Sequence, residues 1–287
     1  MATHFRRAGR SVVVTGGGQG LGREIALGLA AERYIVFGTA ASAQEVEDLR
    51  EASRGRVSLA VCDLKNAETV KAWAAGVSEA IGASGLDILI NNTSHLSPGP
   101  LEIVPLQEVR RGFEMNVFGG LAVINAFLPA LRLAHGRIVQ INAWIEGAPR
   151  HFDGIAAASQ AAMEAFSSAY QAELKPFGID VIVASISDLE SAGTRATASL
   201  AQIDHSMTAA QRKLYGQRLR TCLEKLAGSA GSEGPGEVAA KVIELAVQRR
   251  TPARSSIDPE AKRLMLAIRE RTDAELKKLS SGLAGPY

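Results

Sequence analysis

A short β-branched run that enters a glycine-dense turn constrains the fold of this chain most. Residues 11–14 read as a strand, Thr15 to Gly22 form the turn, and residues 23–30 carry apolar side chains at helical spacing. The turn reads Thr-Gly-x-x-x-Gly-x-Gly, which is not the G-x-G-x-x-G spacing of the dinucleotide fingerprint. A strand, a glycine turn and a helix in this order gather backbone N–H groups and a helix N-terminus around one point. The sequence therefore predicts a phosphate or pyrophosphate site at the turn.

Strand and helix patterns alternate with short connections almost to residue 190. Mostly continuous apolar runs predict further strands over residues 34–39, 57–62, 87–92, 137–142 and 180–186. Helices are expected over residues 44–53, 66–81, 106–133 and 156–175, with Asn66 as a candidate N-cap. This alternation predicts an α/β fold with a Rossmann-like, doubly wound parallel sheet of about seven strands. Ligands of such sheets bind beyond the carboxyl ends of the strands.

The last hundred residues change in pattern without predicting a second domain. Residues 191–233 read as an excursion over the carboxyl edge of the sheet, a lid that contains an amphipathic helix over 209–227. A helix over 237–249, a short edge strand over 255–257 and a charged terminal helix over 259–281 follow. We therefore expect residues 1–287 to form one domain.

Composition limits the classes of function. The chain has 287 residues, a formal net charge of +2 and 46% hydrophobic residues, so nothing argues for nucleic acid or an acidic membrane as partner. No fully apolar run approaches about 18 residues, and no signal-peptide core follows the basic start. The two cysteines, Cys62 and Cys222, form no metal-ligand pattern and are expected to be reduced thiols. We expect a cytoplasmic protein without a metal.

Several motifs, in order and at fitting intervals, resemble those of the classical short-chain dehydrogenase/reductase (SDR) family. The glycine turn has that family's spacing, Asp63 follows the third strand, and Asn91-Asn92 opens the motif after the fourth. Asn116 matches the family's catalytic asparagine within the long helix. Residues 158–167 resemble the sequence that follows the active-site tyrosine of that family. The resemblance covers roughly residues 11–191, and it implies a nicotinamide dinucleotide and homodimers or homotetramers formed through helices 106–133 and 156–175.

The resemblance also implies a degenerate active site. Aligned on the fifth strand, Ala143 stands at the family's serine, which bonds the substrate oxygen. Ala156 stands at the tyrosine, which is the general acid/base, and Gln160 at the lysine, which binds the ribose and lowers the tyrosine's pKa. An alanine methyl has no proton to give, and a glutamine carries no charge. Of the four catalytic positions only Asn116 keeps the family's residue.

The dinucleotide would be held by residues that the family motif places at the carboxyl edge. They are Thr15, Gly16, Gly18, Gln19, Gly20, Leu21, Gly22, Asp63, Leu64, Asn91 and Ser191. Such folds select NAD with an acid, or NADP with a basic group, near the end of the second strand. Residues 39–42 offer neither, so NAD or NADP is possible and the cofactor could be absent.

Three hypotheses follow. In the first, the chain is an SDR relative that binds a dinucleotide weakly or not at all, or binds another small molecule, and transfers no hydride efficiently. In the second, it is a non-redox enzyme, such as an isomerase, dehydratase or cyclase. In the third, it is an atypical NAD(P)-dependent oxidoreductase of ketones and alcohols. For the last two, His95 paired with Glu146 or Asp188 is the first candidate for proton transfer. Solvated loop residues without chemistry are the commoner explanation of such side chains.

Overall fold

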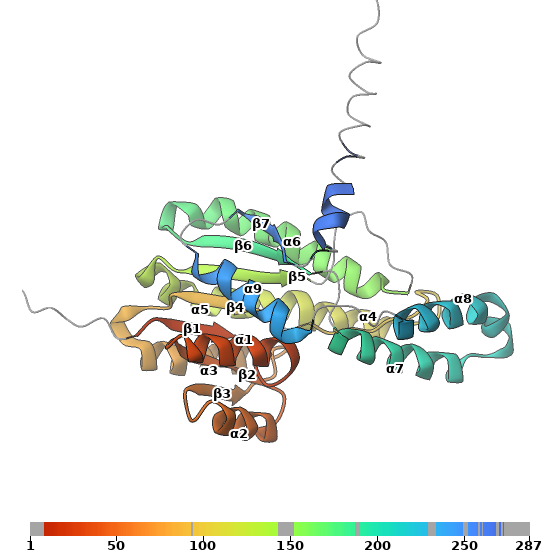
Figure 1. The fold of residues 1–287 in the computed structure, drawn as a ribbon, viewed down its shortest axis with the longest axis horizontal. Helices are drawn as coiled ribbons and strands as arrows, with labels where there is room; N and C mark the ends of the chain where they lie inside the picture. Colours follow the sequence, from red (N-terminus) through yellow and green to blue (C-terminus); the bar gives the residue numbers. More distant parts are fainter. Residues whose placement is uncertain are drawn as a thin grey trace, which may run out of the picture.

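A computed structural model shows how these elements are arranged. It describes residues 9–92, 94–142, 152–186, 190–228, 234–248 and 252–257, together with 259, 261–267, 270 and 272. Side chains are described for the same residues except 190–196 and 225–228. Helices cover both faces of a central sheet (Figure 1).

The sheet has the order β3-β2-β1-β4-β5-β6-β7, with every neighbouring pair parallel. Its strands are β1 Ser11–Val14, β2 Ile35–Ala40, β3 Val57–Val61, β4 Ile88–Asn91, β5 Arg137–Asn142, β6 Asp180–Ser185 and β7 Arg254–Ser256. The prediction of a doubly wound parallel sheet of seven strands is therefore confirmed. The direction of chain winding reverses between β1 and β4, which is where ligands bind in such sheets.

Each face of the sheet carries its own core. Val12 and Val14 of β1 belong to one cluster and Val13 between them to the other, because successive side chains of a strand point to opposite faces. Both faces are thus buried, which explains the continuous apolar runs of the sequence. The helices on the two faces are α1 Gly20–Ala31, α2 Ala43–Ala52 and α9 Pro235–Val247 on one, and α3 Ala67–Ile81, α5 Gly120–Ala134 and α6 Gly154–Leu174 on the other.

The long helix predicted over 106–133 contains a local change of winding. It consists of α4 Leu106–Phe113, the π-helical segment η2 Glu114–Gly119, and α5. Among the described residues it is the one helical run whose length and composition alone would allow a membrane span. Some of its apolar residues, Val123 and Phe127 among them, are nevertheless buried in the core against the sheet, whereas Phe118 is exposed. A π-segment inserts an extra residue into the turn and is frequent at functional sites.

The segment after β6 forms two helices at one end of the molecule. They are α7 Glu190–Ser206 and α8 Ala209–Gly228 (Figure 1), and they pack against the segment before α4, where Tyr215 of α8 donates a hydrogen bond to Glu102. The helix predicted over 209–227 is α8, whereas the sequence analysis does not predict α7, whose small and polar residues give a weak helical pattern. Leu200, Met207 and Leu219 form a separate small core there. The lid function of this hairpin stays a prediction.

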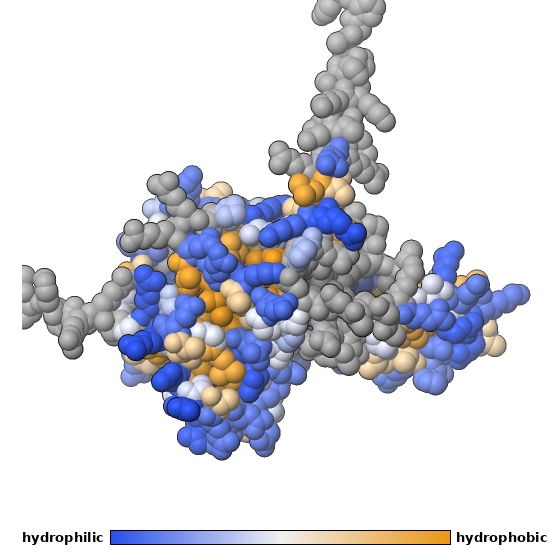
Figure 2. Space-filling model, in the orientation of Figure 1, coloured by the Kyte–Doolittle hydropathy of each residue, from blue (hydrophilic) through white to orange (hydrophobic). Residues whose placement is uncertain are grey.

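The surface differs between the body and this hairpin. On the face drawn in Figure 2, apolar residues gather around α1 and α9, while the α7–α8 end is largely hydrophilic. The edge strand predicted over 255–257 is β7, which pairs with β6. Of the terminal helix predicted over 259–281, the described residues 259, 261–267, 270 and 272 are helical. Two 3-10 turns, η1 Gly82–Ser84 and η3 Lys175–Phe177, follow α3 and α6.

Candidate functional site

The glycine turn between β1 and α1 has a backbone that side chains would disturb. Gly16 and Gly20 have φ values of +63° and +55°, in the left-handed region that favours glycine. A Cβ at Gly22 would lie 2.1 Å from the Gly16 carbonyl oxygen and 2.6 Å from Asn92 Nδ2. The helix therefore packs onto the turn and onto the segment after β4 as closely as its backbone allows.

The N-terminus of α1 is left open for a ligand. Its N-cap, Gln19, makes no side-chain cap bond, and its first turn holds no acidic residue. On the neighbouring helices Ser42 Oγ accepts from the Glu45 N–H, and Asn66 Oδ1 accepts from the N–H groups of Glu68 and Thr69. The predicted Asn66 cap is thus confirmed. The first N–H groups of α1 lack intrahelical partners and carry the positive end of the helix dipole, which suits an anion.

A buried hydrogen-bond network connects the turn to β4 and β5. Thr15 Oγ1 accepts from the Asn92 N–H at 2.9 Å and donates to Asn91 Oδ1 at 3.2 Å. Asn92 Nδ2 donates to the Thr15 carbonyl at 3.2 Å, and Asn91 Nδ2 donates to Gln140 Oε1 at 2.7 Å. Because buried polar groups are costly unless paired, these bonds hold the carboxyl edge in one arrangement. Two of the predicted cofactor residues, Thr15 and Asn91, belong to this network.

Asp63 and Leu64, both predicted cofactor residues, follow β3. The Asp63 carboxylate is half exposed and lies 3.6 Å from Lys65 Nζ, while Leu64 is buried. The structure thus places an accessible acceptor beside a buried apolar side chain.

Asn116 stands in the π-segment and ties three segments together. Its Oδ1 accepts from the His95 backbone N–H at 2.6 Å, and its Nδ2 donates to the His95 carbonyl at 3.0 Å. The same Nδ2 donates to Ser159 Oγ at 2.9 Å, and Ser159 Oγ donates to the Ala156 carbonyl at 3.0 Å. Asn116 therefore fixes the loop after β4 against the start of α6.

Ala156 and Gln160 lie one turn apart on α6, and both are buried. Asn142 Nδ2 donates to the Gln160 carbonyl at 3.4 Å. Within the described part of the chain, Gln160 Oε1 is a buried oxygen without a hydrogen-bond partner. An unpaired buried acceptor costs about 1–3 kcal/mol, so a ligand that donates to it would remove that cost.

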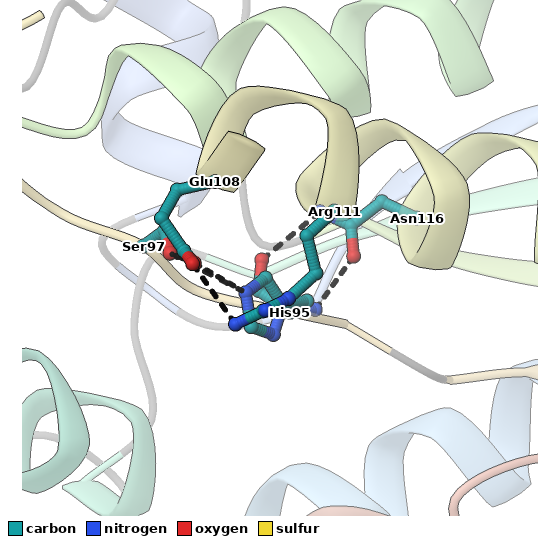
Figure 3. Close-up of polar contacts among 5 residues, drawn as sticks. All are labelled: His95, Ser97, Glu108, Arg111 and Asn116. Atoms are coloured by element: carbon teal, nitrogen blue, oxygen red, sulfur yellow. Dashed lines mark hydrogen bonds and ion pairs between the residues drawn. The ribbon is translucent and has the colours of Figure 1, made fainter. Parts of the chain in front are cut away.

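His95, whose backbone is bonded to Asn116, has its side chain in a cluster with Ser97, Glu108 and Arg111 (Figure 3). Ser97 Oγ donates to Glu108 Oε2 at 3.0 Å and lies 3.3 Å from His95 Nε2. Because the hydroxyl has one proton and gives it to Glu108, the imidazole must donate in the second bond. The proton of His95 is therefore on Nε2, and Nδ1 is left as an acceptor.

This arrangement differs from a nucleophilic serine triad. There, the serine gives its proton to the histidine, whereas Ser97 gives its proton to the carboxylate. Arg111 Nη1 lies 2.9 Å from Glu108 Oε1 and keeps that carboxylate in place. The cluster is thus suited to move a proton between His95 and Glu108 through the Ser97 hydroxyl.

The pKa of His95 is lowered from its ordinary value. Burial of the imidazole is the largest cause, the charge of Arg111 lowers the pKa further, and Glu108 partly opposes both. The neutral imidazole is therefore favoured in the folded protein at neutral pH. A neutral histidine with an unprotonated Nδ1 is a competent general base.

Some predicted site residues lie outside the described residues, and others were missed. Ala143, Glu146 and Asp188 lie outside them, as does the side chain of Ser191, so the predicted pairing of His95 with Glu146 or Asp188 is untested. Sequence reasoning missed Glu108 as a partner of His95, because a loop of irregular conformation separates them and its course sets their distance. Within the described ranges, no three His, Cys, Asp or Glu side chains are grouped so as to hold a metal ion.

Known proteins similar to this chain are dehydrogenases and reductases. Estradiol 17-beta-dehydrogenase 2 of Mus musculus is 31% identical over 177 residues, which cover 60% of this chain and 46% of that protein. NADPH-dependent 3-dehydrocapnine reductase of Ornithobacterium rhinotracheale is 27% identical over 61% of this chain and 63% of that one. The match thus spans less than two thirds of either relative.

Solved structures share the fold over a larger part of the chain. A short-chain dehydrogenase from Streptomyces avermitilis superposes with a TM-score of 0.79 at 23% identity and covers 99% of this chain and 100% of its own. A metagenomic short-chain oxidoreductase in complex with NADP has a TM-score of 0.68 at 21% identity, over 88% of this chain and 98% of its own. The family model for short chain dehydrogenase matches residues 10–201. With that match and the parallel sheet around the glycine turn, this chain belongs to the short-chain dehydrogenase family.

Proposed function

We propose that this protein binds a nicotinamide dinucleotide on its glycine turn but transfers no hydride by the tyrosine-dependent route of its family. The observation that carries the proposal is the contrast between two parts of one site. The turn keeps its glycines and an uncapped helix N-terminus, whereas alanine and glutamine stand at positions 156 and 160. The solved NADP complex of a structural neighbour supports the dinucleotide as ligand class.

The residues present fit such a group. The N–H groups at the start of α1 would hold the pyrophosphate, and Asn91 and Asp63 stand at the edges of the same site. The unpaired Gln160 Oε1 is an acceptor that a ribose hydroxyl could satisfy. When bound, a nicotinamide ring supplies hydride donor or acceptor chemistry. At position 156 the chain itself has no proton donor to accompany that step.

Calorimetry and activity assays test the proposal together. We expect NADH or NADPH to bind with measurable heat, and no turnover with a panel of ketones and alcohols. Absence of binding by either dinucleotide would refute the first half, and steady turnover would refute the second. The variant A143S/A156Y/Q160K restores the three family residues, and a gain of carbonyl reduction there would support the alignment. Because Ala156 is buried, circular dichroism must first show that the variant folds.

The His95 cluster supports a second candidate function, non-redox proton transfer. Here the Nδ1 atom of His95 removes a proton from a carbon next to a substrate carbonyl, and the electron pair of that C–H bond forms an enolate. The Nε2 proton passes to Ser97 while the Ser97 proton passes to Glu108, so charge does not accumulate on the imidazole. Return of a proton at another carbon would complete an isomerisation without any oxidant.

Exchange of α-protons for deuterium in simple cyclic ketones, followed by NMR, tests this candidate without knowledge of the natural substrate. We expect the native protein to exchange these protons faster than H95Q. A native rate equal to that of H95Q would exclude the histidine as a base for this class of compound.

A further inference from the structure

The Glu45 carboxylate lies on the glycine turn. Glu45 is in the first turn of α2, and its Oε2 accepts from the Ala41 N–H at 2.9 Å. A Cβ built on Gly18 would be 2.1 Å from the same Oε2 and 2.9 Å from Glu45 Cβ and Cδ. The side chain therefore covers Gly18, which has no side chain to keep it away.

Two hydrogen bonds fix this position. Ser42 Oγ accepts from the Glu45 N–H at 3.2 Å, and the carboxylate reaches back to Ala41, in the manner of a capping box. In the described part of the chain, no Lys or Arg side chain forms an ion pair with Glu45. The negative charge of Glu45 is therefore not neutralised by an ion pair within that part of the chain, and it lies between Ala41, which follows β2, and Gly18 of the glycine turn.

Resting on the proposed function, we propose that Glu45 sets the choice of dinucleotide, so that the protein takes NAD in preference to NADP. In folds of this kind an acid about 20 residues after the glycine turn bonds the ribose 2′-hydroxyl, usually from the end of the second strand. Residues 39–41 are uncharged here, and Glu45 brings a carboxylate to the same junction from α2. The carboxylate accepts from a ribose hydroxyl and repels a 2′-phosphate.

The repulsion between the Glu45 carboxylate and a 2′-phosphate determines how strongly the protein should prefer NAD over NADP. A 2′-phosphate carries close to two negative charges at neutral pH, and charges a few ångströms apart near a protein surface interact strongly enough to change affinity by about tenfold or more. Salt weakens the interaction of exposed charges, so the preference for NAD should shrink at high ionic strength.

Calorimetric titration of NADH and NADPH into the native protein, E45Q and E51Q tests the inference. The E45Q variant keeps an oxygen that can accept from the Ala41 N–H and loses only the charge. Glu51 lies on the same helix and is exposed, so E51Q is the matched control for net charge. Thermal unfolding of each variant verifies that it is folded.

We expect the native protein to bind NADH about tenfold or more tightly than NADPH. In E45Q the ratio should fall to within about threefold, mainly through tighter NADPH binding, while E51Q keeps the native ratio. Binding of both dinucleotides with equal affinity by the native protein, or an unchanged ratio in E45Q, overturns the inference and leaves the proposed function intact. Absence of binding by either dinucleotide overturns both.

Discussion

Replacement of Gly22 by alanine tests whether the close contact between α1 and the glycine turn holds the site together. The added Cβ would lie 2.1 Å from the Gly16 carbonyl oxygen, far inside normal contact distance. This neighbour is backbone and cannot rotate away, so the turn or the helix must move. Gly76 provides a matched control, because it lies inside α3 and a Cβ there meets nothing within 4 Å.

Two opposing effects decide whether G22A gains or loses unfolding free energy. Alanine in place of a helical glycine stabilises a protein by about 0.5–1 kcal/mol. Overpacking usually costs about 1–3 kcal/mol, and the rigid backbone contact places G22A at the upper end. We therefore expect G22A to lose about 2–2.5 kcal/mol of unfolding free energy, which is the cost of overpacking less the gain in helix propensity. G76A should gain about 0.5–1 kcal/mol.

Urea unfolding followed by circular dichroism measures both changes, and the unfolding temperature should shift by about 2 °C per kcal/mol. G22A should also bind dinucleotide more weakly, because displacement of Gly16 changes the turn that holds the phosphates. A G22A protein as stable as G76A would show that the turn adapts at no cost. The close contact between Gly22 and Gly16 would then not be required to hold the site together.

Four further predictions concern other parts of the structure. Glu108 raises and Arg111 lowers the pKa of His95. E108Q should therefore move the NMR titration of the imidazole to lower pH, and R111Q should move it to higher pH. Shifts of the same sign in both variants would contradict the arrangement of the cluster. The pKa of His95 is lower in the folded than in the unfolded protein, so its contribution to the unfolding free energy is present at neutral pH and is lost as pH falls through the folded-state pKa. The unfolding free energy of H95Q, measured in urea, should therefore fall less steeply with decreasing pH, and a slope equal to that of the native protein would contradict this. Removal of the α3 cap in N66A should cost about 1 kcal/mol in urea unfolding, and an unchanged midpoint would refute the cap. Phe118, which is 56% exposed on η2, should help to form the predicted interface between subunits, so F118D should reduce the mass measured by light scattering; an unchanged mass with intact secondary structure would exclude this residue.

The elements and their order were predictable because local patterns determine them. Valine runs such as residues 12–14 indicate strands that are buried on both faces. Asn66 directly before a helical pattern, with Glu68 in the first turn, indicates an N-cap. Parallel pairing then follows from alternation of strands with helices. The π-segment around Asn116 was not predictable, since it continues the apolar pattern of the helix on both sides.

The packing of the helices that are predicted to form a subunit interface also needed the structure. Helical spacing alone leaves open whether Phe113, Val117 and Phe166 pack inside the chain or face a partner. The structure buries Val117, packs Phe113 against the core and leaves Phe166 43% exposed. The direction of each side chain depends on how α4, η2 and α6 are rotated against the sheet, which no local pattern determines.

By itself the sequence determined the fold and the glycine turn, while the residues that it assigns to the family's catalytic positions stay a prediction. Only the tertiary structure decided which charges meet. The partner of His95 is Glu108, and the acid at the glycine turn is Glu45 of α2, where the end of the second strand alone offers none. The physical reason is that periodicity records the environment of each residue along one element. Distances between side chains on different elements depend on loop paths and helix rotation, and they appear when the elements pack together.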